Sequence, residues 1–160
     1  MHDSPQVPSD VHLPLGGAGW ICLFSPETWD LAKESGFAQI AFPHSREKTA
    51  KRIRVGDIII CYVSQRMTLS GILAVDSKCA VDRDNSIYKQ AGEYPVIGTT
   101  SPLYILSRQR EVPLQPHVRS FAMFRGISTP SGWTVALRRS PKGISKADLN
   151  KFLSLIMSTT

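Results

Sequence analysis

Basic side chains gather in two stretches of the sequence. Residues 44–54 contain five Lys or Arg and one acid, and residues 138–151 contain five more against one acid. The formal net charge is +6, from 19 Lys and Arg and 13 Asp and Glu, so the rest of the chain is mildly acidic. Such a charge distribution suits a polyanionic partner, because a Lys or Arg that meets a phosphate releases bound counterions. Charge alone leaves a solvated surface without a partner equally open.

Six basic residues are candidate phosphate contacts, and all lie in or shortly after the first basic stretch: Arg46, Lys48, Lys51, Arg52, Arg54 and Arg66. Contacts of this kind position a nucleic acid without reading its sequence. The six side chains cannot all face one nucleic-acid strand. For some of them, exposure to solvent on a helix surface without a partner remains the alternative.

Residue types that support catalysis are present without a catalytic spacing. The four histidines lie in no H-E-x-x-H motif, and neither G-x-S-x-G nor a phosphate-binding glycine loop occurs. Cys22, Cys61 and Cys79 lack the C-x-x-C spacing of a zinc or redox site, which indicates buried, reduced thiols. We therefore expect no catalytic residue, no metal and no cofactor. A Cys–His pair, or His44 with a carboxylate in a small nucleic-acid hydrolase, stays open as an alternative.

Length and composition indicate one globular domain in an intracellular protein. The chain has 160 residues, of which 42% are apolar and 20% charged, which excludes wholesale disorder. Its longest apolar runs, 18–24 and 58–63, are far shorter than the ~18–20 residues of a membrane span. The N-terminus does not resemble a signal peptide, so a cytoplasmic location is expected. We expect a flexible N-terminal tail over residues 1–18 and the domain over residues 19–160.

The elements that would position these residues begin with a buried strand over residues 20–24. Ser25-Pro26-Glu27 then starts a helix, since Ser accepts a free amide proton and Pro loses nothing at the first helical position. Gly36 can end that helix in the left-handed conformation. Residues 37–42 form a second extended segment. Ser45 is expected to cap a helix over residues 46–53, followed by a turn at 54–57.

The rest of the chain predicts a small sheet and a final helix. Residues 58–63 and 70–76 read as a hairpin around the loop 64–68, with 77–93 mostly irregular. Further strands are expected at 94–99, 103–106 and 133–137, with a short helix around 116–124. Ser145 and Asp148 fit a capping box for a C-terminal helix with one apolar face, formed by Leu149, Phe152, Leu153 and Ile156. Short strands interrupted by helices favour an α+β domain with a strongly curved sheet over a doubly wound parallel one.

Several motifs occur together in a fixed order. Residues 20–29 hold a strand with a Trp that runs into a helix with a second Trp, and residues 55–63 hold a Gly-Asp turn before an aliphatic strand ending in Tyr-Val. A Gly-Ile strand at 71–75, the segment 84–88 and a Tyr-Pro pair at 94–95 follow. Together they resemble the EVE domain family, which has the PUA-like fold and is related to YTH domains. The resemblance covers about residues 19–157.

This resemblance implies a PUA-like domain, with a curved mixed sheet or open β-barrel flanked by short helices, that binds nucleic acid. A modified base, methylated or hydroxymethylated, would be turned out of its strand into an aromatic pocket. The candidate base-binding residues are Trp20, Phe24, Ser25, Trp29, Phe42 and Tyr62. Core packing is the alternative for each ring, and plain helix capping for Ser25. Many relatives carry a Trp after the first helix, where this chain has only Phe37 or Phe42, and Phe42 is the preferred stacking ring.

The expected partner is nucleic acid, with DNA favoured over RNA because the resembled family is associated with restriction and defence systems. That association also implies a nuclease or restriction partner. An RNA-binding PUA-like module and a protein-interaction domain remain alternatives. Salt distinguishes the last of these, because nucleic-acid binding weakens steeply as the salt concentration rises.

Overall fold

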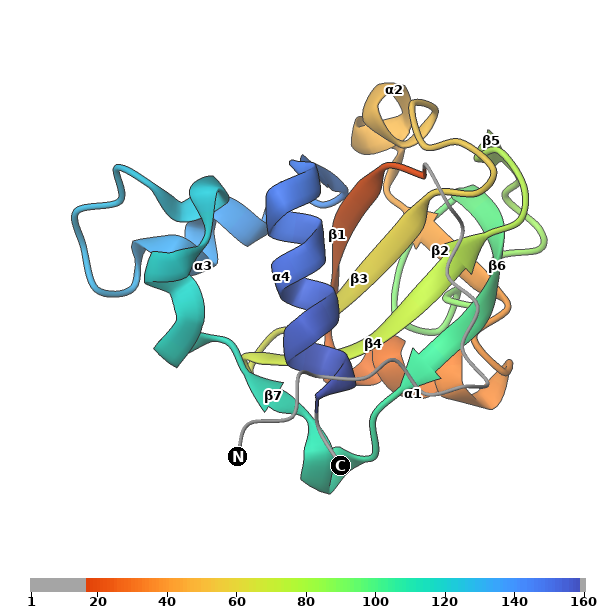
Figure 1. The fold of residues 1–160 in the computed structure, drawn as a ribbon. Helices are drawn as coiled ribbons and strands as arrows, with labels where there is room; N and C mark the ends of the chain where they lie inside the picture. The colour runs from red at the N-terminus through yellow and green to blue at the C-terminus, as the bar shows by residue number, and fades with distance from the viewer. Residues whose placement is uncertain (1–16, 159–160) are drawn as a thin grey trace.

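The computed structural model describes residues 17–158, which form an α+β fold around a strongly curved mixed sheet (Figure 1). The sheet has eight strands, and its main path runs β2-β6-β4-β3-β1-β8. The strands are β1 (Gly19–Phe24), β2 (Gln39–Phe42), β3 (Ile58–Val63), β4 (Thr68–Val75), β5 (Ala80–Val81), β6 (Val96–Ile105), β7 (Val112–Pro113) and β8 (Lys142–Ile144). Among the strands of residues 17–158, only the β1–β3 pair is parallel, while the other paired strands are antiparallel. The predicted α+β class and curved sheet are confirmed.

The first strand and helix form as their sequence predicts. The α1 helix (Pro26–Glu34) begins after Ser25, whose hydroxyl accepts from the Thr28 backbone N–H at 3.0 Å, while the Thr28 hydroxyl accepts from the Ser25 N–H at 2.8 Å. This reciprocal pair satisfies two amides that the helix leaves without partners. Gly36 follows the helix with φ +71°, a left-handed conformation that suits glycine.

The sheet separates two apolar clusters, because alternate side chains of a strand point to opposite faces. In β3, Ile59, Cys61 and Val63 point to one face, and the intervening residues point to the other. We call these the α1 face, which α1 and β2 cover, and the α4 face, which α4 (Lys146–Met157) covers. Figure 1 shows α4, in dark blue, lying across β1, β3 and β4. Both faces of the central strand are therefore buried.

The segment after β2 is less helical than predicted. Residues 44–53 form a 3₁₀ turn (His44–Arg46) and the short α2 helix (Glu47–Ala50), and Arg46 rather than Ser45 occupies the N-cap position of α2. No side chain caps this helix. The chain instead turns after Ala50 so that both Ala50 and Ile53 enter the α1-face cluster. The predicted helix over 46–53 is therefore confirmed only over Glu47–Ala50, and its predicted Ser45 cap is wrong.

The segment before β8 contains the largest departure. Residues 133–137, predicted as a strand, lie in the α3 helix (Gly132–Leu137), where Trp133 and Leu137 are buried one helical turn apart and Val135 is exposed. The run is apolar throughout, so its composition suits a strand as well as a helix. The last strand is β8, which pairs with the first half of β1.

The remaining differences lie in the second half of the chain. The two strands predicted at 94–99 and 103–106 are one, β6, which continues past Pro102 at an irregularity in its pairing with β4. In place of the helix predicted around 116–124, 3₁₀ helices span Gln115–Ser120 and Ala122–Phe124; a third spans Arg108–Arg110. The predicted β3–β4 hairpin is confirmed.

The predicted C-terminal helix is confirmed, but half of its capping box is not. Ser145 accepts from the Asp148 backbone N–H at 3.1 Å. The Asp148 carboxylate does not return this bond and instead accepts from the backbone N–H groups of Ala122 and Met123 at 2.8 and 2.9 Å. It thereby joins α4 to the preceding 3₁₀ helix. None of the helices within residues 17–158 has the length and apolar character that a membrane crossing requires.

Candidate functional site

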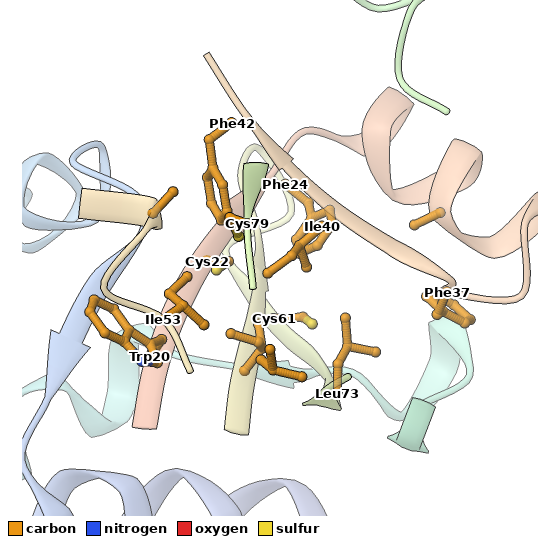
Figure 2. Packing of buried hydrophobic residues seen from close by; sticks show 14 of the residues in the cluster. Trp20, Cys22, Phe24, Phe37, Ile40, Phe42, Ile53, Cys61, Leu73 and Cys79 are labelled. Atoms are coloured by element: carbon orange, nitrogen blue, oxygen red, sulfur yellow. The ribbon is translucent and has the colours of Figure 1, made fainter. Parts of the chain in front are cut away.

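A cavity of ≈ 330 Å³ lies on the α1 face, where the end of β1 meets the start of α1. Its walls come from residues 22–25 and 40–43, from the loop between β5 and β6, and from the segment just before β8. Figure 2 shows Phe24, Ile40 and Phe42 close together on this side of the sheet, near Cys22. The volume lies at the lower end of the ~300–1,000 Å³ range of small-molecule sites. The cavity is therefore suited to one small flat group.

Three aromatic side chains besides Phe24 line this cavity. Phe42 comes from β2, whereas Tyr88 and Tyr94 come from the loop between β5 and β6, with ring centroids 6.2 Å apart in an edge-to-face arrangement. The Tyr88 hydroxyl donates to the Gln39 carbonyl at 2.6 Å, which fixes the ring against β2. Burial raises the pKa of Tyr88 far above its ordinary value, so the phenol stays neutral. The sequence predictions missed both tyrosines, although the Asp84–Tyr88 segment and the Tyr94-Pro95 pair carried part of the family resemblance.

The polar groups of the cavity are mostly uncharged. The hydroxyls of Ser25 and Thr28 bond each other and the local backbone. The Leu23 N–H donates to the Ser140 hydroxyl at 2.9 Å. Because N–H and C=O of one residue leave a strand on the same side, the Leu23 carbonyl also points toward this wall. Ser64 adds another hydroxyl. Neutral donors and acceptors of this kind suit the edge of a neutral heterocycle.

Trp20 and Trp29 do not line the cavity. The indole N–H of Trp20 donates to Asp57 Oδ2 at 2.9 Å, and the same carboxylate accepts from the backbone N–H groups of Arg54 and Ala18. Asp57 thus stabilises its turn and also anchors Trp20. Trp29 is buried between Phe24 and Phe37, with ring centroids 5.2 and 5.0 Å away. For these two rings the alternative of core packing is the observed one.

Tyr62 lies on the opposite side of the sheet. In the parallel β1–β3 pair, Tyr62 is opposite Leu23, so its side chain points away from the face that carries Phe24. It packs edge-to-face on Trp133, with centroids 6.1 Å apart, within the α4-face cluster. Of the six candidate base-binding residues, the structure thus brings Phe24, Ser25 and Phe42 to the cavity and places the other three elsewhere.

The candidate phosphate contacts divide into engaged and exposed side chains. Arg46 donates to the backbone carbonyls of Ser140, Arg139 and Pro141 at 3.0, 2.9 and 3.3 Å. It therefore binds the cavity wall itself. Exposed side chains without an ion pair among residues 17–158 remain at three of the six predicted positions: Lys48, Arg52 and Arg54.

The other two candidates form ion pairs. Lys51 pairs with Glu47 at 2.6 Å and, mainly through this hydrogen bond, holds the pKa of that carboxyl below its ordinary value. Arg66 pairs at 3.1 Å with the buried carboxylate of Glu111, which Arg108 also contacts at 3.2 Å. Arg66 therefore neutralises a buried carboxylate and is not free to bind a ligand phosphate.

The structure places His44 and the three cysteines, the groups for which a catalytic role remained an alternative, in different surroundings: Cys22 lines the cavity, and the other three do not. His44 lies 3.3 Å from Glu47, but its side chain is exposed and does not line the cavity. Burial raises the pKa of the Cys22 and Cys61 thiols well above the ordinary value, which opposes the thiolate that a nucleophile requires. Within residues 17–158, no three His, Cys, Asp or Glu side chains are placed to hold a metal ion.

No family model matches the chain, and no curated protein matches it in sequence. Solved structures match it in fold. The Pho92 YTH domain in complex with m6A aligns with a TM-score of 0.66 at 13% identity, over 94% of this chain and 90% of that one. The YTH domain of Zygosaccharomyces rouxii MRB1, in complex with N6-methyladenosine RNA, gives 0.60 at 16% identity over 96% of both chains.

Human THYN1, in complex with DNA containing 5-methylcytosine, aligns with a TM-score of 0.56 at 12% identity, over 87% of this chain and 97% of that one. Identities this low show shared architecture rather than shared ligand. The chain has the PUA-like fold that YTH domains and THYN1 share, in agreement with the fold that its sequence motifs implied.

Proposed function

We propose that this chain is a nucleic-acid-binding module that takes a single modified base, turned out of its strand, into the cavity between β1, α1 and β2. The observation that carries this proposal is an aromatic cavity of ≈ 330 Å³ whose charged lining residues are both arginines, Arg46 and Arg138. The compared proteins support it, since the two YTH domains were solved with N6-methyladenosine and THYN1 with 5-methylcytosine DNA.

The energetics of such binding are consistent with this site. Turning a base out of its stack costs a few kcal/mol, and stacking on one aromatic ring contributes about 1–3 kcal/mol. Phe42 and Tyr94 are the rings that we expect to contribute, because both line the cavity; Phe42 is buried in the α1-face cluster, whereas Tyr94 is only half-buried. A methyl group on the base adds apolar contact of about 0.8 kcal/mol, and more where it fills a fitted void.

We propose DNA as the strand that carries the modified base. Support comes from the THYN1 complex and from the association of EVE-like domains with restriction systems, where a nuclease partner would act on the recognised DNA. RNA is the second candidate, favoured by the two YTH complexes. We also propose binding without catalysis in a cytoplasmic protein; the protonated thiols and the exposed His44 support the first part of this proposal.

The test is a titration of short single strands, made as DNA and as RNA, that carry one 5-methylcytosine, 5-hydroxymethylcytosine or N6-methyladenine. We expect one modified strand to bind about tenfold more tightly than its unmodified control, as a buried methyl in a close-fitting pocket predicts. Equal affinity for all strands would overturn the proposal and leave a general polyanion binder.

A variant pair locates the effect in the cavity. Phe42→Leu keeps apolar bulk but removes the flat ring, so it should reduce the preference for the modified strand more than it reduces binding to the plain strand. Phe124→Leu makes the same change on the α4 face and should leave the preference intact. An unchanged preference in Phe42→Leu would contradict stacking on this ring.

A further inference from the structure

A second hollow of ≈ 380 Å³ adjoins the cavity. Half of its lining residues are basic, namely Arg46, Arg52, Arg139 and Lys142. Trp20, Thr49, Pro141 and Gly143 complete the described lining, which contains no acidic side chain. We call this site the basic hollow. It draws on both basic stretches of the sequence, which the fold brings together beside β8.

The positive charge of the basic hollow is not neutralised within the described chain. None of its four cations has a carboxylate at ion-pair distance among residues 17–158. The nearby acid on α2, Glu47, pairs instead with Lys51 and His44. Arg46 bonds three backbone carbonyls, which satisfy its N–H groups but leave its charge uncompensated. Clustered cations without counter-charges create a potential that attracts anions.

The segment before β8 forms the partition between the two sites. Arg138 and Ser140 line the cavity, whereas Arg139 and Pro141 line the basic hollow, so successive residues contribute to opposite sides. Arg46 borders both sites and holds this partition through its bonds to the carbonyls of residues 139–141. A ligand group in the cavity and an anion in the basic hollow would therefore be separated by this single segment of the chain.

We infer that the basic hollow binds a phosphodiester group directly next to the turned-out nucleotide, on one defined side of it. The inference rests on the proposed function, and it assigns the phosphate contacts to Arg52, Arg139 and Lys142. The guanidinium groups of Arg52 and Arg139 are exposed and have the planar fork that fits phosphate oxygens. Arg46 acts as a fixed charge and a positioning residue. Lys51 and Arg66, held by Glu47 and Glu111, do not take part.

The experiment replaces single phosphodiesters by neutral methylphosphonates on the 5′ or the 3′ side of the modified nucleotide. For the unaltered protein, one of the two replacements should lower affinity about tenfold, as expected for loss of charge-assisted bonds, and the other should have little effect. In the triple variant R52Q/R139Q/K142Q, the sensitive position should become insensitive. The slope of log affinity against log salt should fall by about 0.7 for each phosphate of a single strand that the variant no longer neutralises.

A charge-matched variant, R110Q/R119Q/R125Q, removes three exposed arginines that line neither site and should keep the position-specific response. If the protein prefers the modified base but both neutral linkages bind as well as the charged ones, the inference is wrong and the proposed function stands. The inference is equally wrong if the triple variant keeps the sensitive position. If the protein shows no preference for a modified base, both the proposed function and this inference are wrong.

The last experiment uses inorganic phosphate, since a free anion could bind the basic hollow through the same contacts as a phosphate of the nucleic-acid strand. Phosphate that binds the hollow but leaves oligonucleotide affinity unchanged would identify a free-anion site and overturn the assignment to the strand. Phosphate that competes with the oligonucleotide, and no longer binds R52Q/R139Q/K142Q, would support it.

Discussion

Aromatic side chains gather on both faces of the sheet, and a cavity adjoins them on each. On the α4 face, Phe124 and Trp133 border one of ≈ 360 Å³ away from the end of β1. On the α4 face, Phe121 and Phe152 stack with centroids 4.1 Å apart and planes 20° from parallel, so the rings occupy one another's surfaces. On the α1 face, Phe42 and Tyr94 line a cavity of ≈ 330 Å³. A count of aromatic residues would not distinguish these regions.

The difference lies in how completely the backbone covers each face. The α4 helix lays Leu149, Phe152 and Ile156 along the sheet over 12 residues. On the other side, β8 pairs only with Gly19–Ile21 and leaves the end of β1 without a strand neighbour on that edge. The Ser140 hydroxyl meets the Leu23 N–H there instead. The cavity lies where this strand neighbour stops early, which leaves space beside the rings of the α1 face.

The largest expected effect is on the stability contributed by the α4 face. Phe152→Ala removes a fully buried ring from the Phe121 stack and should lower the free energy of unfolding by about 3–5 kcal/mol. The measurement is urea unfolding followed by fluorescence. Affinity for the modified strand, measured where the variant remains folded, should stay unchanged. A loss of affinity with intact stability would contradict the division of roles between the two faces.

The next effect concerns the α1 face. Tyr94→Ala should weaken binding of the modified strand by about 1–3 kcal/mol, the contribution of one stacked ring. Its ring is only half-buried, so the unfolding free energy should change much less than in Phe152→Ala. The control is Tyr104→Ala, which removes a half-buried ring that packs on the α4 face. Equal affinity losses in the two variants would show that the cavity rings have no special part in binding.

The smallest effect is a pH dependence that belongs to the α4 face. Burial raises the pKa of Tyr62 to about 12 from an ordinary value near 10. Because the folded state favours the neutral phenol, this contribution to stability is complete below pH ~10 and is lost as the pH rises to about 12. Tyr62→Phe should remove that part of the decline in unfolding free energy, measured at several pH values in this window. Parallel curves for both proteins would contradict the assignment.

Local signals predicted the fold well wherever one side chain settled the conformation. Ser25, Gly36 and Ser145 start or end helices through their own hydroxyl or backbone, so neighbouring sequence was sufficient. The prediction for residues 133–137 failed because their apolar run fits either a strand or a helix. In the helix, Trp133 packs against Tyr62, which lies far away in the sequence, and against Phe124, which lies in another element. A short stretch of sequence does not reveal tertiary contacts of this kind.

The sequence predicted the cavity residues at the ends of two strands, Phe24 with Ser25 and Phe42, and missed those in the loop between β5 and β6. Phe24 and Ser25 reach the cavity because the strand-to-helix junction itself forms the wall. Trp20 does not reach the cavity, because its indole N–H donates to Asp57, 37 residues away in the sequence. The register of the parallel β1–β3 pair decides the face of Tyr62, and sequence alone does not give that register. Tyr88, in contrast, lies in an irregular loop whose path follows no periodicity.

The partition before β8 also limits how its length can vary. Because neighbouring residues there alternate between two sites, deleting or inserting one position would exchange their lining, placing Arg139 where Arg138 had been. A substitution would alter a single contact, whereas an insertion or deletion would change the lining of both sites at once. Natural variants of this domain should therefore tolerate new side chains between residues 138 and 142 far better than a changed number of them.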